Sequence, residues 1–570
     1  MGSAITIDHI LKPKPAQQFQ FLGKWLVGYD PAEFAYPAIL SLLATLQDRL
    51  QSQKLVYKYV HLQLGRSVVR NRYFLFADRL FIAHNGVDQR LLKTDPGAFV
   101  VRSALAPLAR PVRSVSLLFP RLDSDPRWKT MGLPAAQLFL ASGLQTAGFQ
   151  VTASALSLPD ENRPSEALKA DMTGFTLFED LLPALRPFLA DFKAAYDGIL
   201  AAGGPFPTLA PLAALQHLPQ INLFIRGEAE IGLPFILDAL NRGDIDALFR
   251  VKGFFWQQPG VIVISDLDRV MRPETFRRFT VDLGFLRPEH VQDGLEMNFS
   301  RGCNRGCLFC CRVQGRTLRK LPLDKAEEML KAYDARLSRF QPNGSAARTV
   351  NINDDDILQD PAYAAAIFAL LKKYDFRIHG IQTAPASLLD ADGRAKGAVL
   401  YMIKARDLYV EDRPLLWLGS DVFLSRRARR LGKRLPSREG FTALLAELEK
   451  RGLRHFHYWI GSDGESTWEE FVEELSLIVG FYAAFPGFGL LAHAPFVVPY
   501  PASRLFGRLD PDTPNLKFKL DLNAPDPRFA FRVVERLETR WPQLNCLLRN
   551  EKAGGEAGFF DLLKAKDFMA

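Results

Sequence analysis

The stretch Arg301-Gly302-Cys303-Asn304-Arg305-Gly306-Cys307-Leu308-Phe309-Cys310-Cys311 determines how the rest of the chain is interpreted. It holds four of the five cysteines in the 570-residue sequence, and the first three stand at the spacing C-x3-C-x2-C. An alternating run from Leu295 to Ser300, which predicts a β-strand, comes directly before it. Three thiolates on one short loop can hold three irons of a [4Fe-4S] cluster and leave the fourth iron open.

A zinc site or a set of disulfides would also gather cysteines, but both fit this chain less well. A structural zinc site needs four ligands, usually from two separated pairs, and the sequence has no second C-x2-C pair. A disulfide framework does not suit a chain of this size with one leftover cysteine, Cys546. Cys311 adjoins Cys310, and neighbouring residues rarely reach one metal in good geometry. We therefore expect Cys303, Cys307 and Cys310 to be the cluster ligands and the catalytic residues.

This cysteine spacing resembles that of the radical S-adenosylmethionine (SAM) enzymes. In that family the open iron binds the amino and carboxylate groups of SAM, and reductive cleavage of SAM gives a 5'-deoxyadenosyl radical. The resemblance implies a partial (β/α)6 barrel, with the chemistry at the carboxyl ends of its strands. Six strand-like segments separated by helical ones fit such a barrel: 295–300, 349–353, 377–382, 415–418, 455–460 and 489–496.

The same resemblance makes residues at the expected strand ends candidates for binding SAM. Phe309 takes the position beside the adenine, and Asp354-Asp355-Asp356 follows the second strand, where the family engages the SAM amino group. Three adjacent carboxylates repel one another unless they meet cations or donors, although Asp356 could simply cap the next helix. Further candidates are Gln382, Ser420 and Asp421. The segment Gly461 to Glu470 resembles the family's G-x-PGET-x-E motif with its proline replaced, and Thr467 is expected to begin a capped helix.

A second alternation of strands and helices precedes the cysteine loop. Strands are predicted over 114–119, 151–156, 172–178, 198–202 and 221–225, and helices over 133–147, 181–195 and 231–241. This alternation predicts a doubly wound parallel sheet, whose ligands bind at the carboxyl ends of the strands. Two of those ends carry Gly203-Gly204-Pro205-Phe206-Pro207-Thr208 and Arg226-Gly227-Glu228-Ala229-Glu230. Paired glycines let the backbone approach a bulky ligand, and Thr208 can cap the next helix.

Together these segments resemble the Rossmann-like cobalamin-binding domain that precedes the core of cobalamin-dependent radical SAM enzymes. The resemblance implies that cobalamin is contacted by Thr176, Leu177, Gly203, Gly204, Pro205, Thr208, Arg226, Gly227 and Glu228. Domains that ligate cobalt from the protein carry D-x-H-x-x-G after the first strand. Here the loop from Asp123 to Gly132 has no histidine, which implies a corrin with a weak or absent lower ligand.

We expect five regions along the chain, consistent with a length that suggests about two to four domains. They are an accessory region of unknown role (1–110), the cobalamin-binding domain (111–248), a linker with a hairpin (249–290), the radical SAM core (291–500) and a C-terminal extension (501–570). Within the first region, the pattern favours a helix over 37–62 and strands over 73–76 and 80–83.

The activity implied by the resemblance is methylation of an unactivated carbon, through methylcobalamin and a 5'-deoxyadenosyl radical. Relatives with the same two domains also catalyse cyclisation or ring rearrangement without methyl transfer, so that alternative stays open. An RNA-modifying enzyme and a non-catalytic cobalamin or redox sensor are further alternatives. The cofactors expected are a [4Fe-4S] cluster, SAM and cobalamin, with an electron donor such as flavodoxin or ferredoxin. The substrate (a small molecule, lipid or peptide) is not identified by the sequence.

The charge balance and the ends of the sequence give weaker indications. The net charge is +9, and the densest basic run, Arg426 to Arg430 with Lys433 and Arg434, is interpreted as a solvated helix face. The alternative is that these side chains line a site for the SAM carboxylate or an anionic substrate. We do not expect a nucleic-acid partner. The start lacks the features of a signal peptide and no long apolar run appears, so we expect a cytoplasmic location with no membrane span.

Overall fold

The computed structural model describes most of residues 108–496, together with five short strands before residue 85. The residues that it does not describe are 1–18, 22–23, 27–57, 62–71, 76–79, 85–107, 123–132, 159–164, 179–180, 210–213, 215–217, 249–250, 252, 259–260, 266–269, 292–293, 312, 341–347, 411–413, 464 and 497–570. The predictions for the loop 123–132, for the extension 501–570 and for Cys546 therefore fall outside the described residues. The chain divides into two compact units, Met1–Leu286 and Arg287–Ala570.

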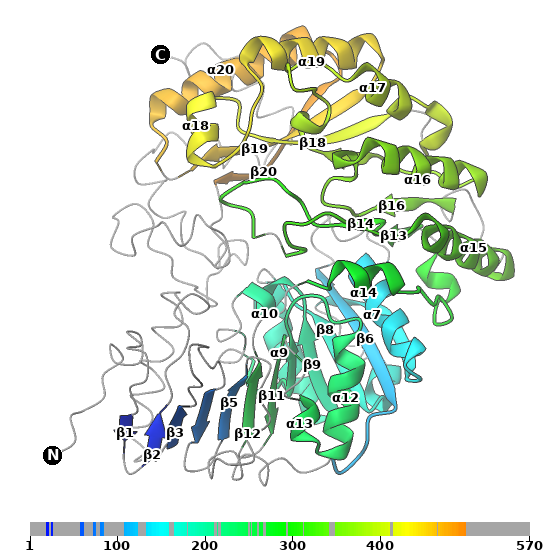
Figure 1. The fold of residues 1–570 in the computed structure, drawn as a ribbon, viewed down its shortest axis with the longest axis vertical. Helices are drawn as coiled ribbons and strands as arrows, with labels where there is room; N and C mark the ends of the chain where they lie inside the picture. Colours follow the sequence, from blue (N-terminus) through cyan, green and yellow to red (C-terminus); the bar gives the residue numbers. More distant parts are fainter. Residues whose placement is uncertain are drawn as a thin grey trace. The chain divides into compact units, whose positions relative to one another are not determined.

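The first unit is built on a mixed ten-stranded sheet, one half of which is parallel (Figure 1). Its five parallel strands lie in the order β10-β9-β8-β6-β7. They are β6 (Ser114–Leu122), β7 (Gln150–Leu158), β8 (Met172–Thr176), β9 (Ile199–Gly203) and β10 (Leu223–Ile225). All five predicted strands of this part of the chain are thus present. Because these strands are parallel, their carboxyl ends meet at one edge of the sheet.

A hairpin and three early strands extend this sheet. The hairpin strands β11 (Phe254–Gln258) and β12 (Val261–Ser265) pair antiparallel, with β11 next to β10. On its other side β12 pairs in parallel with β5 (Leu80–His84), followed by β4 (Arg72–Leu75) and β3 (Lys58–His61). A separate pair is formed by β1 (Phe19–Phe21) and β2 (Lys24–Leu26). The helix predicted over 37–62 is wrong at its end, since Lys58–His61 pairs as a strand.

The first unit has helices between its parallel strands and after the last of them. They are α7 (Ala135–Thr146), α8 (Ser165–Lys169), α9 (Leu182–Ala194), α10 (Pro205–Leu209), α12 (Gly232–Arg242), α13 (Ile245–Leu248) and α14 (Pro273–Arg278). Helix α12 ends at Gly243, whose φ of 64° is the left-handed conformation that favours glycine. Leu118, Phe224 and Phe255 are fully buried and form part of the core between sheet and helices.

The second unit repeats the alternation with parallel strands. The strands β13 (Leu295–Met297) and β16 (Val350–Ile352) pair with each other, as do the short antiparallel strands β14 (Ser300–Arg301) and β15 (Arg319–Lys320). A four-stranded parallel sheet follows in chain order, with β17 (Ile381–Thr383), β18 (Leu415–Asp421), β19 (Arg454–Ser462) and β20 (Phe488–Phe496). The single bridge between Thr349 and Arg377 lies between these two sets of strands. All six predicted segments of this part of the chain contain strands or a bridge into the sheet.

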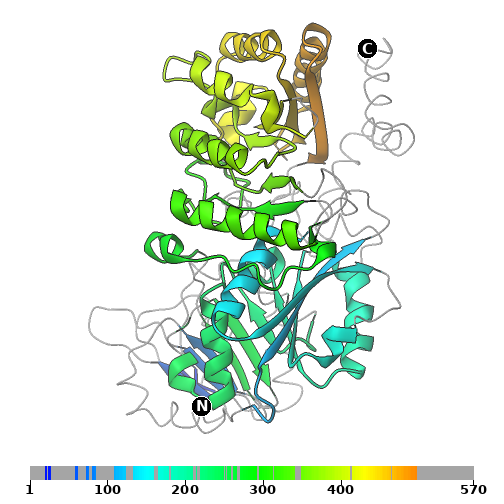
Figure 2. The ribbon, with the colours of Figure 1, turned by 90° about the vertical axis from the view of Figure 1, so that its right-hand side faces the viewer.

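Three helices of the second unit begin at a residue whose side chain caps them. They are α15 (Leu323–Phe340), α16 (Pro361–Lys373), α17 (Gly397–Ile403), α18 (Ser425–Arg430), α19 (Arg438–Lys450) and α20 (Trp468–Ala484), with short 3-10 turns η2 (Pro288–His290), η4 (Ile357–Gln359), η5 (Pro385–Ser387) and η6 (Arg406–Leu408). Asp360, Ser437 and Thr467 accept a backbone N–H at the start of α16, α19 and α20. The capped helix predicted at Thr467 is confirmed. Helices α15 and α16 pack side by side (Figure 2).

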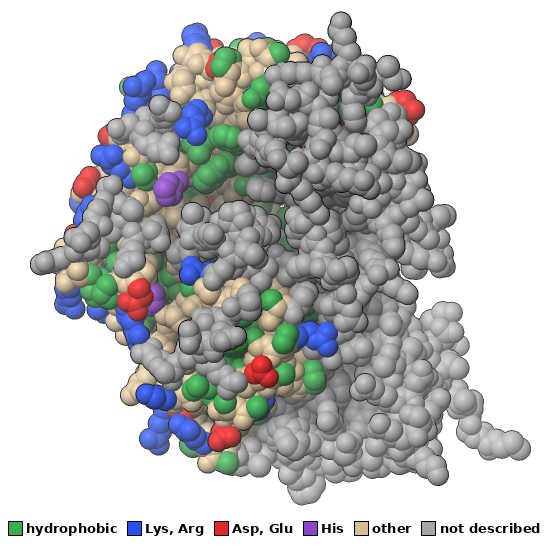
Figure 3. All heavy atoms as spheres, turned by 180° about the vertical axis from the view of Figure 1, so that it is seen from behind, with side chains coloured by type: hydrophobic (Ala, Val, Ile, Leu, Met, Phe, Trp, Pro, Cys, Tyr) green, Lys and Arg blue, Asp and Glu red, His purple; other side chains and the backbone are tan. Residues whose placement is uncertain are grey.

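The surface carries charges of both signs. On the face drawn in Figure 3, Lys and Arg side chains form several small groups with Asp and Glu among them. Among the described helices, none is both long and apolar enough to cross a membrane.

Candidate active site

The cysteine loop begins where the short strand β14 ends. Gly302, the first residue after this strand, has a φ of 92°, and a Cβ atom there would lie 2.3 Å from the carbonyl oxygen of Thr317. Only glycine fits this close approach. Cys303 and Cys307 are half-buried and Cys310 is exposed. Burial raises the pKa of the Cys303 thiol, and nearby Asp356 and Asp355 act in the same direction while Arg305 opposes them.

The second half of the loop packs against the end of α18. The N–H of Leu308 donates to the carbonyl of Leu431 (2.8 Å), and Gly432 approaches so closely that a Cβ atom would lie 3.0 Å from the carbonyl oxygen of Gly306. Leu308 belongs to a buried cluster with Val422, Ala428 and Leu431, and Phe309 packs on that cluster. The structure thus places Phe309 on the loop beside α18, and its predicted contact with adenine stays a prediction.

Three thiols on one loop are a donor set that fits a [4Fe-4S] cluster with one open iron. Within the described residues, no three His, Cys, Asp or Glu side chains gather closely enough to hold one metal ion. A [4Fe-4S] cluster does not need such convergence, because each thiolate binds a different iron. Two cations lie near the loop to compensate the negative charge of thiolates. Arg305 is part of the loop, and Lys433 interacts electrostatically with Cys303, Cys307 and Cys310. The donor set present therefore fits a cluster bound by three cysteines.

The side chains of the three carboxylates that follow β16 all contact residues in the cysteine loop or directly before it. Asp354 is buried and accepts the N–H groups of Phe299 (2.8 Å) and Ser300 (2.7 Å). Asp355 accepts the N–H of Gly302 (2.9 Å). Asp356 is buried and forms an ion pair with Arg305 (2.9 Å).

Asp356 has further partners on the other side. It accepts the hydroxyls of Thr383 (2.6 Å) and Ser387 (2.8 Å). The alternative that Asp356 caps the next helical turn is wrong, since its side chain makes no capping hydrogen bond there. Binding of SAM by any of the three carboxylates stays a prediction.

A cavity of about 330 Å³ lies beside the cysteine loop. Its walls are Asn304, Arg305, Gly306, Cys307, Ala384, Gly432, Lys433 and Arg434. The Lys433 side chain is 6% exposed, with its ammonium against the carbonyl of Gly419 and the carboxylate of Asp421. Burial lowers its pKa to about 8, and the neighbouring thiols oppose that shift. The cavity therefore brings a cysteine and basic groups together, an arrangement suited to an anionic group next to the cluster site.

Of the other predicted SAM-binding residues, two lie at the end of β18 and one in β17. Gln382 is exposed. Asp421 has a left-handed φ of 62° and pairs with Lys433, so it lies directly behind the cavity wall. Ser420 is fully buried, and its hydroxyl lies 2.7 Å from Nδ1 of His457. Ser420 is therefore directed toward a buried histidine pair, His457 and His455, whose rings are joined by a hydrogen bond of 2.9 Å.

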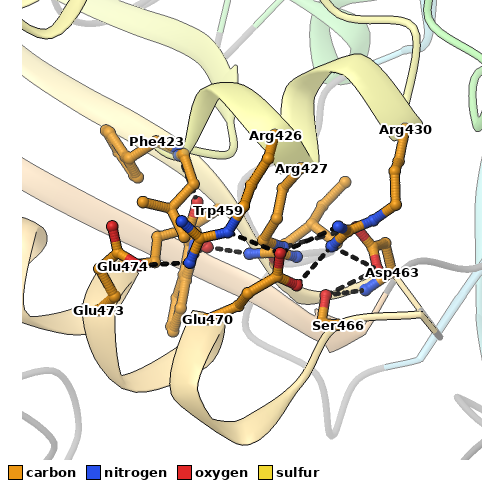
Figure 4. A network of polar contacts seen from close by, with 12 residues as sticks. Phe423, Arg426, Arg427, Arg430, Trp459, Asp463, Ser466, Glu470, Glu473 and Glu474 are labelled. Carbon is orange, nitrogen blue, oxygen red and sulfur yellow. Dashed lines mark hydrogen bonds and ion pairs between the residues drawn. The ribbon is translucent and has the colours of Figure 1, made fainter.

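The basic run on α18 is built into a network of ion pairs (Figure 4). Arg427 is fully buried and pairs with the equally buried Glu474, and a second contact joins it to Asp463 at 3.5 Å. Arg430 pairs with Glu470 at 2.6 Å. The interpretation of this run as a solvated face is wrong for Arg427, because its carboxylate partners lie on α20 and after β19. The network fixes α18, whose end contacts the cysteine loop.

In the first unit, the residues predicted to bind cobalamin come together at adjacent strand ends. The N–H of Leu177 donates to Gly203 (2.8 Å), and the hydroxyl of Thr208 donates to Gly204 (2.7 Å). The same hydroxyl accepts the N–H of Gly227 (2.9 Å), so one side chain links the two glycine segments. Thr208 lies within α10 and does not cap it, because the helix already begins at Pro205.

The remaining residues predicted to bind cobalamin lie at or near the same edge of the sheet. Gly204 has a φ of 99°, next to Pro205 at the start of α10. The hydroxyl of Thr176 lies 3.5 Å from the amide nitrogen of Gln137. Arg226 is buried with its guanidinium over the ring of Phe255, and Glu228 accepts the N–H of Met271 (2.6 Å). Cobalamin binding by these residues stays a prediction.

Sequence reasoning missed several residues that surround the cysteine loop. Arg305, Lys433 and Gln359 were not among the predicted site residues, although the charged groups stand within or near the motifs. The sequence did contain a signal for Arg305, because it is a basic residue inside the cysteine motif itself. Lys433 lies in the basic run for which an anion site was the alternative interpretation, and its burial follows from the fold alone.

The chain resembles solved enzymes over most of its length. The TsrM structure from Kitasatospora setae, a radical S-adenosylmethionine methyltransferase with tryptophan and a SAM analogue bound, matches with a TM-score of 0.51 and 14% identity over 69% of this chain and 75% of that chain. OxsB, a cobalamin-dependent S-adenosylmethionine radical enzyme with aqua-cobalamin and SAM bound, matches with a TM-score of 0.51 and 13% identity over 78% of this chain and 64% of that chain.

Sequence comparison alone gives a shorter match. An uncharacterized methyltransferase of Pyrococcus horikoshii is 27% identical over 113 residues, which are 19% of this chain and 24% of that relative. The match thus spans about a quarter of the relative's length. No family model matches the chain. At these identities the structural likeness is a likeness of fold: the chain shares the fold of TsrM and OxsB over most of its length.

Proposed function

We propose that this chain is a cobalamin-dependent radical SAM enzyme and that its activity is methylation of an unactivated carbon. The observation that carries the proposal is the cysteine loop, with three thiols at C-x3-C-x2-C after a strand and a cavity lined by Cys307, Arg305 and Lys433 beside it. The fold of TsrM and OxsB supports it, as does the short match to a methyltransferase.

Each part of the second unit then has a role. Cys303, Cys307 and Cys310 would hold the cluster, which when bound supplies the electron for SAM cleavage. Lys433 and Arg305 would pair with the carboxylate of SAM, because both line the cavity next to Cys307. Asp421 would hold the Lys433 ammonium in position. The alternating parallel strands and helices of this unit support a partial (β/α)6 barrel.

The first unit would hold cobalamin, which when bound carries the methyl group. The strand order β10-β9-β8-β6-β7 supports a doubly wound sheet, and bulky cofactors bind at the carboxyl ends of such strands. Gly203, Gly204 and Gly227 leave backbone accessible there, and Thr208 fixes their loops to each other. A radical SAM enzyme also needs an external electron donor, for which we propose a flavodoxin or ferredoxin. The substrate would be a small molecule, lipid or peptide.

The test is anaerobic reconstitution with iron, sulfide and cobalamin, followed by incubation with SAM and a reductant. We expect an iron–sulfur spectrum and a corrin spectrum, and both 5'-deoxyadenosine and S-adenosylhomocysteine as products. Absence of corrin binding would overturn the two-cofactor assignment. The runner-up, a cyclase or rearranging enzyme, predicts 5'-deoxyadenosine without S-adenosylhomocysteine. A Cys303→Ala/Cys307→Ala/Cys310→Ala variant is the control, and it should give neither product.

A further inference from the structure

The segment from Asp354 to Tyr363, between β16 and the first turn of α16, is hydrogen-bonded along the first half of the cysteine loop. Asp354 accepts two successive backbone N–H groups, those of Phe299 and Ser300, and also the hydroxyl of Ser300 at 2.6 Å. Both of its oxygens are engaged with the strand that leads into the loop. A buried carboxylate held in this way fixes the backbone that it accepts from.

Gln359 holds the loop itself on two sides. Its side-chain oxygen accepts the N–H of Asn304 at 3.0 Å, and its side-chain nitrogen donates to the carbonyl of Gly302 at 3.3 Å. These two backbone groups flank Cys303. Asp355 accepts the N–H of Gly302 at 2.9 Å, so Cys303 lies between backbone positions that are both bound to this segment.

Tyr363 and Asp356 hold the two ends of the contact between this segment and the cysteine loop. The hydroxyl of Tyr363 lies within hydrogen-bonding distance of the carbonyls of Phe299 (2.8 Å) and Leu321 (2.7 Å). Asp356 pairs with Arg305 at 2.9 Å, two residues after Cys303. Every one of these contacts is made by protein groups alone. The chain's own hydrogen bonds therefore hold the backbone on both sides of Cys303.

We propose that Asp354, Asp355, Asp356, Gln359 and Tyr363 form a loop brace that sets the conformation around Cys303 before any cluster is bound. They are positioning residues, and their assignment to cluster binding rests on the proposed function. The brace also offers a different role for the three carboxylates from direct contact with SAM. A brace residue acts on the chain without cofactors, whereas a SAM ligand acts only when SAM is present.

The experiment measures hydrogen–deuterium exchange with residue-resolved fragmentation on the full chain without cofactors. Gln359→Ala should accelerate exchange of the Asn304 amide, and Asp355→Ala that of the Gly302 amide, each by about fivefold, as expected for loss of one typical hydrogen bond. The amide of Leu308, in the second half of the loop, donates to the carbonyl of Leu431 (2.8 Å) and is the internal reference, with unchanged exchange. Asp392→Ala, in an exposed turn of the same unit, is the matched control.

A second measurement tests whether the brace affects binding of the cluster. The double variant Asp355→Ala/Gln359→Ala should take up iron and sulfide more slowly than wild type and give an altered electron paramagnetic resonance signal of the reduced cluster. Exchange at Gly302 and Asn304 that is already unprotected in wild type, or unchanged in the variants, would overturn the brace. Protected amides in a chain that never accepts a cluster would instead overturn the proposed function and leave the brace standing.

Discussion

Removal of the Glu474 carboxylate tests whether the network around α18 supports the second unit. Glu474 and Arg427 are both fully buried, and Glu474 also accepts the N–H of Leu424 (3.0 Å) and of the Trp459 indole (3.0 Å). Burial already lowers the pKa of Arg427 to about 10. Glu474→Ala would leave this cation with one carboxylate, Asp463, at 3.5 Å. It would also remove the acceptor of three neutral donors, since the N–H of Phe423 donates to Glu474 as well.

The expected loss is large compared with that at the neighbouring residue. Breaking a buried ion pair by removing one partner costs about 3–5 kcal/mol, a sizeable part of the ~5–15 kcal/mol that holds a domain folded. Glu473→Ala is the matched control, because Glu473 is adjacent on α20 and pairs with Arg426 while 52% of its side chain is exposed. Such a surface pair contributes about 0–1 kcal/mol.

The assay is urea unfolding followed by tryptophan fluorescence, with hydrogen exchange of peptides from 425–484 assigning the transition to the second unit. We expect Glu474→Ala to lower the free energy of unfolding by several times the effect of Glu473→Ala. Arg427→Met/Glu474→Leu should recover part of the loss, since an apolar pair of similar volume leaves no buried charge. Equal effects of the two single alanine variants would refute the reasoning.

Three other expectations follow from the site and its surroundings. Cys310→Ala should abolish incorporation of a [4Fe-4S] cluster, measured as iron and sulfide per chain, whereas the adjacent Cys311→Ala should retain it; equal loss in both would contradict the ligand assignment. Lys433→Gln should weaken SAM binding by about 10- to 100-fold, as loss of a hydrogen bond to a charged group predicts, with the exposed Lys450→Gln unchanged in the same calorimetric titration. Burial lowers the pKa of His455 from 6.5 to about 4, so between these pH values the unfolded chain binds a proton that the folded chain does not bind. Acidification from pH 6.5 to 4 should therefore lower the free energy of unfolding of the second unit by about 3 kcal/mol through this residue. Urea unfolding at several pH values should show that the free energy of unfolding changes less with pH in His455→Gln than in wild type.

Much of the fold could be predicted because its signals are local. Alternation of strands and helices predicted the five parallel strands of the first unit and the six strand segments of the second, within a few residues of their ends. The cysteine motif could be interpreted because its meaning depends only on spacing. Thr467 was predictable for the same reason, since Glu470 stands three residues later and completes a capping box.

The roles of individual side chains were harder to predict because they depend on partners far away in the sequence. Arg427 looks like one of several surface arginines, and its burial depends on Glu474, 47 residues later. Asp354 is predicted from the sequence to bind SAM, yet its oxygens accept hydrogen bonds from backbone groups 54 and 55 residues earlier. The hydroxyl of Thr208 bonds both to Gly204 within its own turn and to Gly227 across the next strand. Which distant residue fills such a contact is set by the register of the strands, which the local pattern does not contain.

The pairing of β5 with β12 has a practical consequence for anyone who shortens this protein. A version that starts at residue 111 would keep every predicted cofactor residue but lose the strand that covers β12. Five backbone positions of β12, from Val261 to Ser265, would then be left without their neighbour. The exposed edge would read Val-Ile-Val-Ile, an apolar strand with open hydrogen-bonding groups, which is the kind of edge that recruits other chains into aggregates. The early strands act as a cover for that edge, and the trimmed protein is expected to precipitate even with an intact active site.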